Sequence, residues 1–133
     1  MSTVKPKRLL IADDDADLLT AYVLFFEAYG YETRTARDGL DALVEYRAWH
    51  PEIVVLDIQM PRLDGRAVAK EIRNLKAMPA PLLVAVSALS AAAELAGSIQ
   101  SGFDRHFVKP AQLRTILAAM ESWQRACSAN RFS

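Results

Sequence analysis

The sequence has only one cysteine, no long hydrophobic run and no excess of charge of either sign. Cys127 has no second cysteine to pair with, which excludes an intramolecular disulfide framework and a zinc site built from cysteines. The apolar run nearest the N-terminus, residues 9–12, is too short for a signal sequence or a membrane span. Lys+Arg and Asp+Glu both number 16, and no basic block occurs. We therefore expect a cytoplasmic protein with neither nucleic acid nor a membrane as a direct partner.

Glycine-rich turns, internal repeats and low-complexity segments are also missing. Because no glycine-rich turn follows the first apolar run, a dinucleotide-binding domain is unfavoured. The 133 residues are 52% hydrophobic and 24% charged, which suits one globular domain with a substantial core. We expect this domain to cover residues 7–126, between an N-terminal tail at 1–6 and a C-terminal tail at 127–133.

Apolar runs of strand length alternate with helical patterns along the chain. In the helical segments, apolar residues recur every three or four positions, which is typical of a helix with one buried face. Asp38 and Asp64 are expected to cap the second and third helices, and Ser90 is expected to begin a fourth that closes near Gly102. The expected strands span residues 9–12, 32–36, 53–56, 82–86 and 107–108.

The order of these elements predicts an α/β fold with a parallel sheet. The first, third and fourth strands are the most apolar and belong at the centre, where both faces are covered. The polar second strand and the short fifth suit the edges. This pattern predicts a flavodoxin-like five-stranded parallel sheet in the order 2-1-3-4-5, with five helices divided between both faces.

Polar side chains follow four of these strands. Because the carboxyl ends of parallel strands meet at one edge of a sheet, we expect the residues there to lie together and to form the site. Carboxylate groups follow the first and third strands, a hydroxyl group follows the fourth, and an ammonium group follows the fifth. These residues are Asp13, Asp14 and Asp15, then Asp57, Ser87 and Lys109.

A divalent cation and a phosphoryl group would suit this set of side chains. Clustered carboxylates repel one another, and Mg²⁺ prefers oxygen ligands and often binds one or two carboxylates together with a phosphate. Asp57 stands alone at the end of the central strand and is the best candidate for a nucleophile that forms an aspartyl-phosphate. Lys109 and the Ser87 hydroxyl could then stabilise charge on the transferred oxygens.

Four motifs give the chain a resemblance to a known family, the receiver domains of response regulators in two-component signalling systems. The resemblance covers residues 7–123, and it is specific because the spacing, the order and the placement at strand ends all agree. The motifs are Ile11-Ala12-Asp13-Asp14-Asp15, Leu56-Asp57-Ile58-Gln59-Met60-Pro61-Arg62-Leu63-Asp64-Gly65, Val86-Ser87-Ala88 and Phe107-Val108-Lys109-Pro110.

The resemblance implies a phospho-acceptor and a Mg²⁺ site. Asp57 would accept the phosphoryl group and would also be a metal ligand. Asp14 would bind Mg²⁺ directly, and Asp13 would hold it largely through water. The backbone carbonyl of Gln59 would complete the ligands supplied by the protein.

The resemblance also implies roles for residues around the phosphate. Ser87 would move toward the phosphate once it forms, and Lys109 would pair first with the Asp57 carboxylate and then with the phosphoryl oxygens. The small side chain of Ala88 would keep the phosphate accessible. A cis bond between Lys109 and Pro110 would form a tight turn that directs the lysine toward the site.

One position departs from the family pattern. His106 stands where the family usually has Tyr or Phe, an aromatic residue that reports phosphorylation by changing its rotamer. The usual switch is therefore altered, or His106 takes the aromatic role and adds pH sensitivity. Ser87 and His106 are the switch residues expected from the resemblance.

The resemblance further implies a phosphorelay function. A sensor histidine kinase or a histidine phosphotransfer protein would donate the phosphoryl group, and the domain would catalyse only its own phosphorylation and dephosphorylation rather than act as an ordinary enzyme. Since the chain ends after the last helix, we expect the signal to pass by binding an unknown downstream protein. The face formed by the fourth and fifth helices is a candidate homodimer surface.

Two other functions stay open. The triplet Asp13-Asp14-Asp15 loosely resembles the Asp-x-Asp start of haloacid-dehalogenase-type phosphohydrolases, although the chain is short for that class and lacks the expected Thr or Val after the second acid. A degenerate receiver that acts only as a binding module is the other alternative, and the intact set of acids argues against it. Each residue alone would more often be structural, so the functional interpretation rests on their joint occurrence.

Overall fold

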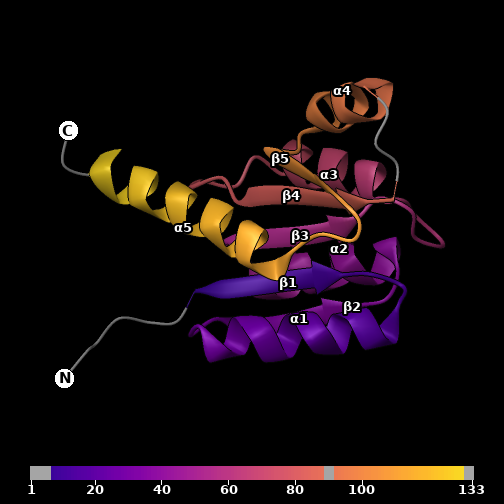
Figure 1. Cartoon of the computed structure of the whole chain (residues 1–133). Helices are drawn as coiled ribbons and strands as arrows, with labels where there is room; N and C mark the ends of the chain where they lie inside the picture. Colours follow the sequence, from indigo (N-terminus) through magenta and orange to yellow (C-terminus); the bar gives the residue numbers. More distant parts are fainter. Residues whose placement is uncertain (1–6, 89–91, 131–133) are drawn as a thin grey trace.

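The structure is a computed structural model that describes residues 7–88 and 92–130 (Figure 1). Strands and helices alternate without exception among these residues, and all the strand pairs are parallel. The strands are β1 Arg8–Ala12, β2 Glu32–Ala36, β3 Ile53–Asp57, β4 Leu82–Ser87 and β5 Arg105–Val108. The helices are α1 Ala16–Ala28, α2 Gly39–Trp49, α3 Gly65–Asn74, α4 Ala92–Ser101 and α5 Leu113–Asn130.

The sheet order is β2-β1-β3-β4-β5, which confirms the predicted flavodoxin-like topology. Strands β3 and β4 are buried along their whole lengths, as expected for central parallel strands with helices on both faces. Strand β2 is mostly exposed and lies at one edge, and the short β5 lies at the other. The apolar content of each run therefore decided its place in the sheet.

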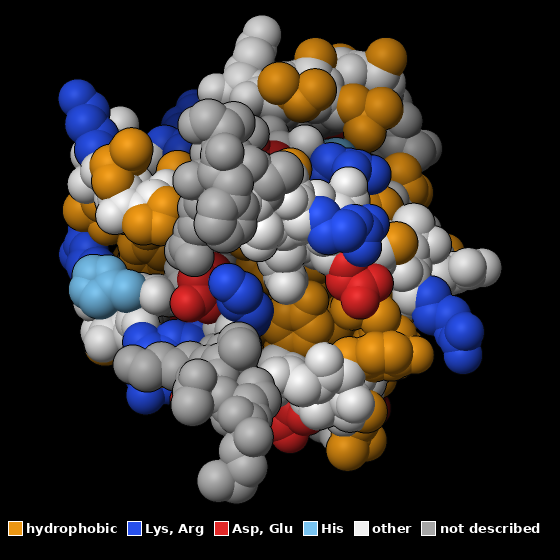
Figure 2. Space-filling view, turned by 90° about the vertical axis from the view of Figure 1, so that its left-hand side faces the viewer, with side chains coloured by type: hydrophobic (Ala, Val, Ile, Leu, Met, Phe, Trp, Pro, Cys, Tyr) orange, Lys and Arg blue, Asp and Glu red, His pale blue; other side chains and the backbone are white. Residues whose placement is uncertain are grey.

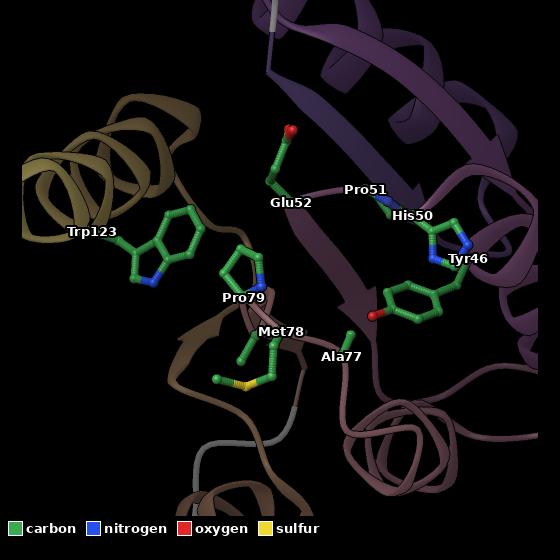
Figure 3. Close-up of a pocket in the computed structure, with 9 residues that line it drawn as sticks. Tyr46, His50, Pro51, Glu52, Ala77, Met78, Pro79 and Trp123 are labelled. Atoms are coloured by element: carbon green, nitrogen blue, oxygen red, sulfur yellow. The ribbon is translucent and has the colours of Figure 1, made fainter. Parts of the chain in front are cut away.

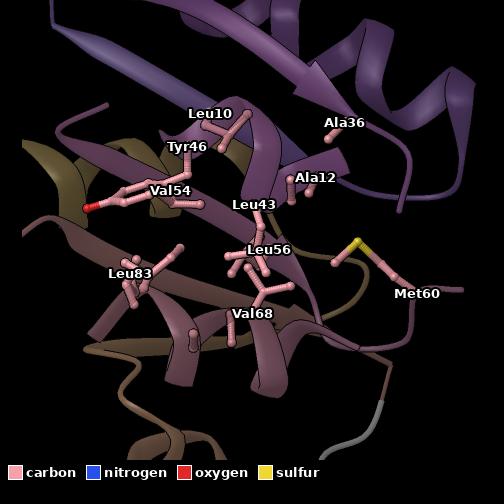
Figure 4. Packing of buried hydrophobic residues seen from close by; sticks show 14 of the residues in the cluster. Leu10, Ala12, Ala36, Leu43, Tyr46, Val54, Leu56, Met60, Val68 and Leu83 are labelled. Carbon is pink, nitrogen blue, oxygen red and sulfur yellow. The ribbon is translucent and has the colours of Figure 1, made fainter. Parts of the chain in front are cut away.

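Two hydrophobic cores lie on opposite faces of the sheet. On one face, α2 and α3 pack against alternate residues of the central strands, such as Leu10 and Leu56 (Figure 4). On the other face, α1 and α5 cover the remaining strand residues, with Phe26 and Met120 fully buried. Complete burial of a side chain of this size contributes about 1.5–3 kcal/mol. These two cores hold the strand ends in fixed positions.

The N-terminal caps of two helices agree with the sequence. Asp38 Oδ1 accepts a hydrogen bond from the backbone N–H of Asp41 at 2.8 Å and caps α2. Asp64 Oδ1 accepts one from the N–H of Ala67 at 2.9 Å and caps α3. The expected start of the fourth helix at Ser90 lies outside the described residues, and α4 is described from Ala92 onward.

The C-terminal end of the domain differs from the sequence-based expectation. Helix α5 continues to Asn130, so the tail expected from Cys127 is helical over residues 127–130. No glycine or proline interrupts the sequence from Leu113 to Asn130, and nothing else there ends a helix. Tyr29 was expected on the buried face of the first helix, but it follows the last turn of α1 and is 51% exposed. The expected tail at residues 1–6 lies outside the described residues.

Within residues 7–88 and 92–130, no helix combines the length and the hydropathy needed to cross a bilayer.

Candidate functional site

Three carboxylates meet where β1 and β3 end. Oxygens of Asp13, Asp14 and Asp57 all lie within 4.8 Å of one another. Asp57 is the last residue of β3 and is 4% exposed, and Asp13 follows β1 directly and is 1% exposed. Asp14 is exposed to solvent. The structure therefore brings together the acids that the strand ends predicted.

Lys109 joins this cluster from the loop after β5. Its Nζ donates a hydrogen bond to Asp13 Oδ2 at 2.9 Å and lies 3.3 Å from Asp57 Oδ2. Its backbone N–H donates to the carbonyl of Ser87 at 2.8 Å, which ties the ends of β4 and β5 together. The peptide bond between Lys109 and Pro110 is cis, as the resemblance implied.

The cluster contains more carboxylate groups than ammonium groups, and this affects the pKa of its members. Burial, followed by the charge of Asp13, raises the pKa of Asp57 above its ordinary value, although Lys109 and the N–H of Gln59 act in the opposite direction. Burial lowers the pKa of Lys109, but its hydrogen bond with Asp13 and the charges of both aspartates outweigh burial, so the net direction is upward. One ammonium group therefore faces two buried carboxylates, with Asp14 beside them.

This donor set fits a hard divalent cation. The cluster offers oxygen atoms alone, and it carries more negative charge than Lys109 neutralises. Mg²⁺ takes oxygen ligands at short distances and is commonly held by one or two carboxylates, with water on its remaining positions. The partial exposure of the cluster at Asp14 leaves a path for water and for a phosphate group.

The third acid of the triplet has a structural role. Asp15 is the N-cap of α1, and its Oδ1 accepts hydrogen bonds from the N–H groups of Asp17 at 3.0 Å and Leu18 at 3.2 Å. The N–H of Asp15 in turn donates to Asp13 Oδ1 at 2.9 Å. The structural interpretation of an aspartate before a helix thus holds for Asp15, while Asp13 and Asp14 contribute oxygen atoms to the acidic cluster.

The segment after β3 is folded closely against Asp57. The N–H of Gln59 donates to Asp57 Oδ1 at 3.2 Å, which orients the carboxylate. The N–H of Gly65 donates to the carbonyl of Ile58 at 2.8 Å. A Cβ on Gly65 would lie 2.4 Å from the carbonyl oxygen of Asp57, so only glycine allows α3 to begin this close to Asp57.

The hydroxyl and small residues after β4 also lie at this edge. Ser87 is fully buried as the last residue of β4, and Ala88 is exposed. Asp57 pairs with Val86 in the sheet register, so β3 and β4 end side by side. Ser87 and Lys109 are therefore at the same edge as Asp57, as the sequence predicted.

His106 and Tyr22 have surroundings that the sequence did not indicate. His106 is half-buried in β5, and its Nδ1 lies 2.8 Å from the hydroxyl oxygen of Ser98 on α4. Tyr22 was expected in the core and is 2% exposed. Burial and the charges of Asp13 and Asp57 raise the pKa of its phenol, so the field of the site extends into this core. No local sequence signal marks Ser98 as the partner of His106.

A separate cavity lies at the opposite end of the sheet, where the strands begin. Figure 2 views that end of the molecule, where hydrophobic side chains gather beside lysine and arginine side chains. The cavity measures about 310 Å³, and Trp123 of α5 faces Pro79 across it (Figure 3). None of the described residues that line this cavity is a predicted site residue. They are Tyr46, His50, Pro51, Glu52, Ala77, Met78, Pro79, Ala80 and Trp123.

Comparisons with known proteins agree with this geometry. A family model for the response regulator receiver domain matches residues 9–121. The probable transcriptional regulator ycf27 of Cyanophora paradoxa is 32% identical over 126 residues, which cover 90% of this chain and 52% of the relative. The transcriptional regulatory protein PrrA of Mycobacterium leprae is 35% identical over 120 residues, which cover 90% and 50%. The chain spans about half the length of these curated relatives.

Solved structures show the same fold. CheY of Borrelia burgdorferi, in a complex with CheX, BeF₃ and Mg²⁺, has a TM-score of 0.80 and 27% identity, with 88% of each chain covered. The receiver domain of the Francisella response regulator 1452 has a TM-score of 0.83 and 26% identity, covering 90% of this chain and 98% of its own. A CheY-like receiver domain protein from Methanospirillum hungatei, at 22% identity, has a TM-score of 0.86 and covers 94% of this chain and 98% of its own.

Proposed function

Because the chain belongs to the response regulator receiver domain family of two-component systems, we propose that Asp57 accepts a phosphoryl group from a phosphohistidine and thereby switches a protein-interaction surface. The observation that carries this proposal is the arrangement of charges around Asp57. Its buried carboxylate lies with those of Asp13 and Asp14 within 4.8 Å, and the ammonium group of Lys109 is 3.3 Å away. The candidate nucleophile Asp57, the candidate metal site and the ammonium group of Lys109, which can bind a phosphate, thus lie side by side.

The chemical step transfers one phosphoryl group. A carboxylate oxygen of Asp57 forms a bond to phosphorus, and the bond from phosphorus to the donor's imidazole nitrogen breaks. The electron pair stays with the imidazole, which takes up a proton from solvent. Lys109 then pairs with the phosphoryl oxygens, and the hydroxyl of Ser87 donates a hydrogen bond to one of them. Ala88 leaves room for the group at the exposed side of the site.

The same residues would hold the metal. Asp14 and Asp57 would supply carboxylate ligands, Asp13 would act largely through water, and Gln59 would supply its backbone carbonyl. When bound, Mg²⁺ supplies positive charge that stabilises the phosphoryl oxygens. The Borrelia relative, whose complex contains BeF₃ and Mg²⁺, supports this assignment.

The output of the domain would be a change in its protein-binding surface. Ser87 ends β4 and Lys109 follows β5, so a new dianionic group at Asp57 shifts the population of conformations at the ends of these strands. His106, on β5, is placed to respond because its ring contacts Ser98 of α4. A histidine kinase or a phosphotransfer protein would be the donor, and a further protein would read the face of α4 and α5, which is also a candidate homodimer surface.

Labelling of matched variants tests this function. The protein is incubated with acetyl phosphate and Mg²⁺, and the intact mass is measured. We expect wild type and Asp15→Asn to gain one phosphoryl group and Asp57→Asn to gain none, because asparagine at position 15 still caps α1. Normal labelling of Asp57→Asn would refute the assignment.

Two further assays separate the alternatives. Sustained turnover of a simple phosphate ester, such as para-nitrophenyl phosphate, would favour a phosphohydrolase. Failure to bind both Mg²⁺ and beryllofluoride would favour a module that binds partners without phosphorylation.

A further inference from the structure

The loop between β3 and α3 contains a strained turn that the phosphoryl chemistry itself does not explain. The N–H of Leu63 donates to the carbonyl of Pro61 at 2.8 Å, so three residues close a tight turn. Arg62, at its centre, has a φ of 69°. Positive φ is costly for a residue with a long side chain, and such a residue persists only when surrounding contacts hold it.

Those contacts come from the start of α2. Asp38 Oδ2 accepts a hydrogen bond from Arg62 Nη1 at 3.2 Å, while Asp38 Oδ1 caps α2. The N–H of Gly39 donates to the carbonyl of Pro61 at 3.4 Å. A Cβ on Gly39 would lie 1.9 Å from the carbonyl oxygen of Leu63, so the helix and the turn are in backbone contact. One carboxylate thus joins the helix cap to the turn.

The turn is connected to the proposed metal site through Gln59. The N–H of Gln59 is fixed by Asp57 Oδ1 at 3.2 Å. On the other side, only Met60, which is 8% exposed, separates Gln59 from the turn that begins at Pro61. The direction of the Gln59 carbonyl therefore depends on the conformation of the turn. The conformation of the turn itself depends on its contacts with α2.

We propose that Asp38 and Arg62 are positioning residues for the metal site, because their ion pair fixes the turn and with it the carbonyl of Gln59. This inference rests on the proposed function, which takes that carbonyl as a ligand. Mg²⁺ demands nearly ideal octahedral geometry, whereas Ca²⁺ tolerates irregular arrangements of oxygen atoms. A looser turn should therefore weaken Mg²⁺ binding more than Ca²⁺ binding.

The test measures both ions on folded, metal-free protein by isothermal titration calorimetry. Asp38→Asn keeps a side chain that caps helices well but loses the charge that pairs with Arg62. We expect its Kd for Mg²⁺ to rise by about two- to fivefold, the range given by exposed ion pairs, with a smaller change for Ca²⁺. Arg62→Gln should weaken Mg²⁺ binding to a similar extent. Arg62→Lys, which keeps the positive charge, should retain part of the preference for Mg²⁺ over Ca²⁺.

The control and the double variant exclude a general loss of stability. Glu45→Gln removes another ion pair of α2, the one with Arg34 at 3.3 Å, and should leave the preference for Mg²⁺ over Ca²⁺ unchanged. The variant that combines Asp38→Asn with Arg62→Gln should be no worse than either single change, because both remove the same interaction.

Two results separate this inference from the proposed function. If the preference for Mg²⁺ over Ca²⁺ in Asp38→Asn and Arg62→Gln equals that of wild type, or if their effects add, the positioning role is refuted and the proposed function stands. If wild type binds no Mg²⁺, or if Asp57→Asn binds it as tightly as wild type, the proposed function fails and this inference fails with it.

Discussion

The ionised carboxylate of Asp57 is destabilised by burial and by neighbouring negative charge, and a bound cation would offset this. Its carboxylate is buried beside Asp13, and Lys109 supplies a single positive charge to both. Burial and the charge of Asp13 raise the pKa of Asp57 above 3.8. A carboxyl group whose pKa is higher in the folded chain than in the unfolded chain destabilises the fold once it is ionised. The metal-free protein should therefore lose stability as the pH rises from 3.8 through the raised pKa of the folded state.

The first prediction concerns Asp57→Asn in the absence of metal. The amide keeps the size of the side chain and removes one of two repelling charges, so we expect the free energy of unfolding at pH 7 to increase by about 0.5–2 kcal/mol. The increase should be smaller at pH 4 than at pH 7, because lowering the pH moves wild-type Asp57 toward its protonated, uncharged form. Urea unfolding with a chelator present measures both values. A variant less stable than wild type at pH 7 would contradict this account.

Magnesium provides the second prediction. Because the ion would bind the folded protein alone, Mg²⁺ should raise the unfolding midpoint of wild type by an amount that grows with its concentration. It should have little effect on Asp57→Asn, which lacks one carboxylate ligand. Thermal unfolding followed by circular dichroism measures the shift, and an equal shift in both proteins would argue that Mg²⁺ binds elsewhere.

Single residues were predictable where strand ends marked them. Asp13 and Asp57 stand at the ends of apolar runs whose burial fixes β1 and β3, and Lys109 follows the short edge strand β5, so their convergence followed from the sequence. The contact between His106 and Ser98 joins residues from different elements, and its existence depends on how α4 packs. No local pattern encodes such packing. The expectation that His106 alters the usual aromatic switch stays a prediction.

Helix α4 differs from the other helices in how it is attached. The only buried residues among its described positions are Ser98 and Ser101, and Ile99 is 67% exposed. Arg66 of α3 pairs with the carboxylate of Glu94 and also donates to the carbonyl of Glu94 at 3.0 Å. Because so little apolar area is buried, local opening of α4 should require less free energy than opening of α5.

The third prediction concerns the contact between Ser98 of α4 and His106 of β5. Ser98→Ala removes the hydroxyl that contacts His106 at 2.8 Å and also donates to the carbonyl of Glu94 at 3.1 Å. Amide hydrogens of α4 should therefore exchange with solvent faster than in Ser101→Ala, by a factor of about 5 for the lost hydrogen bond with His106. Ser101→Ala is the matched control, because its hydroxyl donates to Gly97 within the same helix. Amides of α5 should be unchanged in both. Equal acceleration of α4 by the two variants would contradict a link to β5.

The fourth prediction concerns the cap of α3. Asp64→Ala removes the acceptor for the N–H of Ala67 and should lower the free energy of unfolding by about 1 kcal/mol, whereas Asp64→Asn should cost little. Urea unfolding of both variants measures the difference. Equal losses would show that charge, rather than capping, is what Asp64 contributes.

The arrangement of whole elements was largely encoded in their hydrophobicity. The three most apolar runs became β1, β3 and β4 at the centre of the sheet, and the polar run became the edge strand β2. The exact ends of the helices and strands were harder to predict from the sequence. The last helix runs past Cys127 to Asn130, because neither glycine nor proline stands in between and a frayed end has no sequence signal of its own.

At the scale of the molecule, the two ends of the sheet are chemically distinct. The ends of β1, β3, β4 and β5 carry the acids, the hydroxyl and Lys109, while the opposite end has the apolar cavity that includes Trp123 (Figure 3). The candidate site thus lies at the carboxyl ends of the strands, where ligands bind in open parallel sheets. In the proposed function, the signal would reach α4 through β5, where His106 contacts Ser98.

The most direct test of this account is to map the modified residue after wild-type protein meets a phosphohistidine donor. Phosphorylated protein is reduced with borohydride to mark the acyl phosphate, and its peptides are sequenced by mass spectrometry. We predict that the mark lies on Asp57 and that it requires Mg²⁺. A mark on Asp13 or Asp14, or equal labelling in the presence of a chelator, would contradict the central claim.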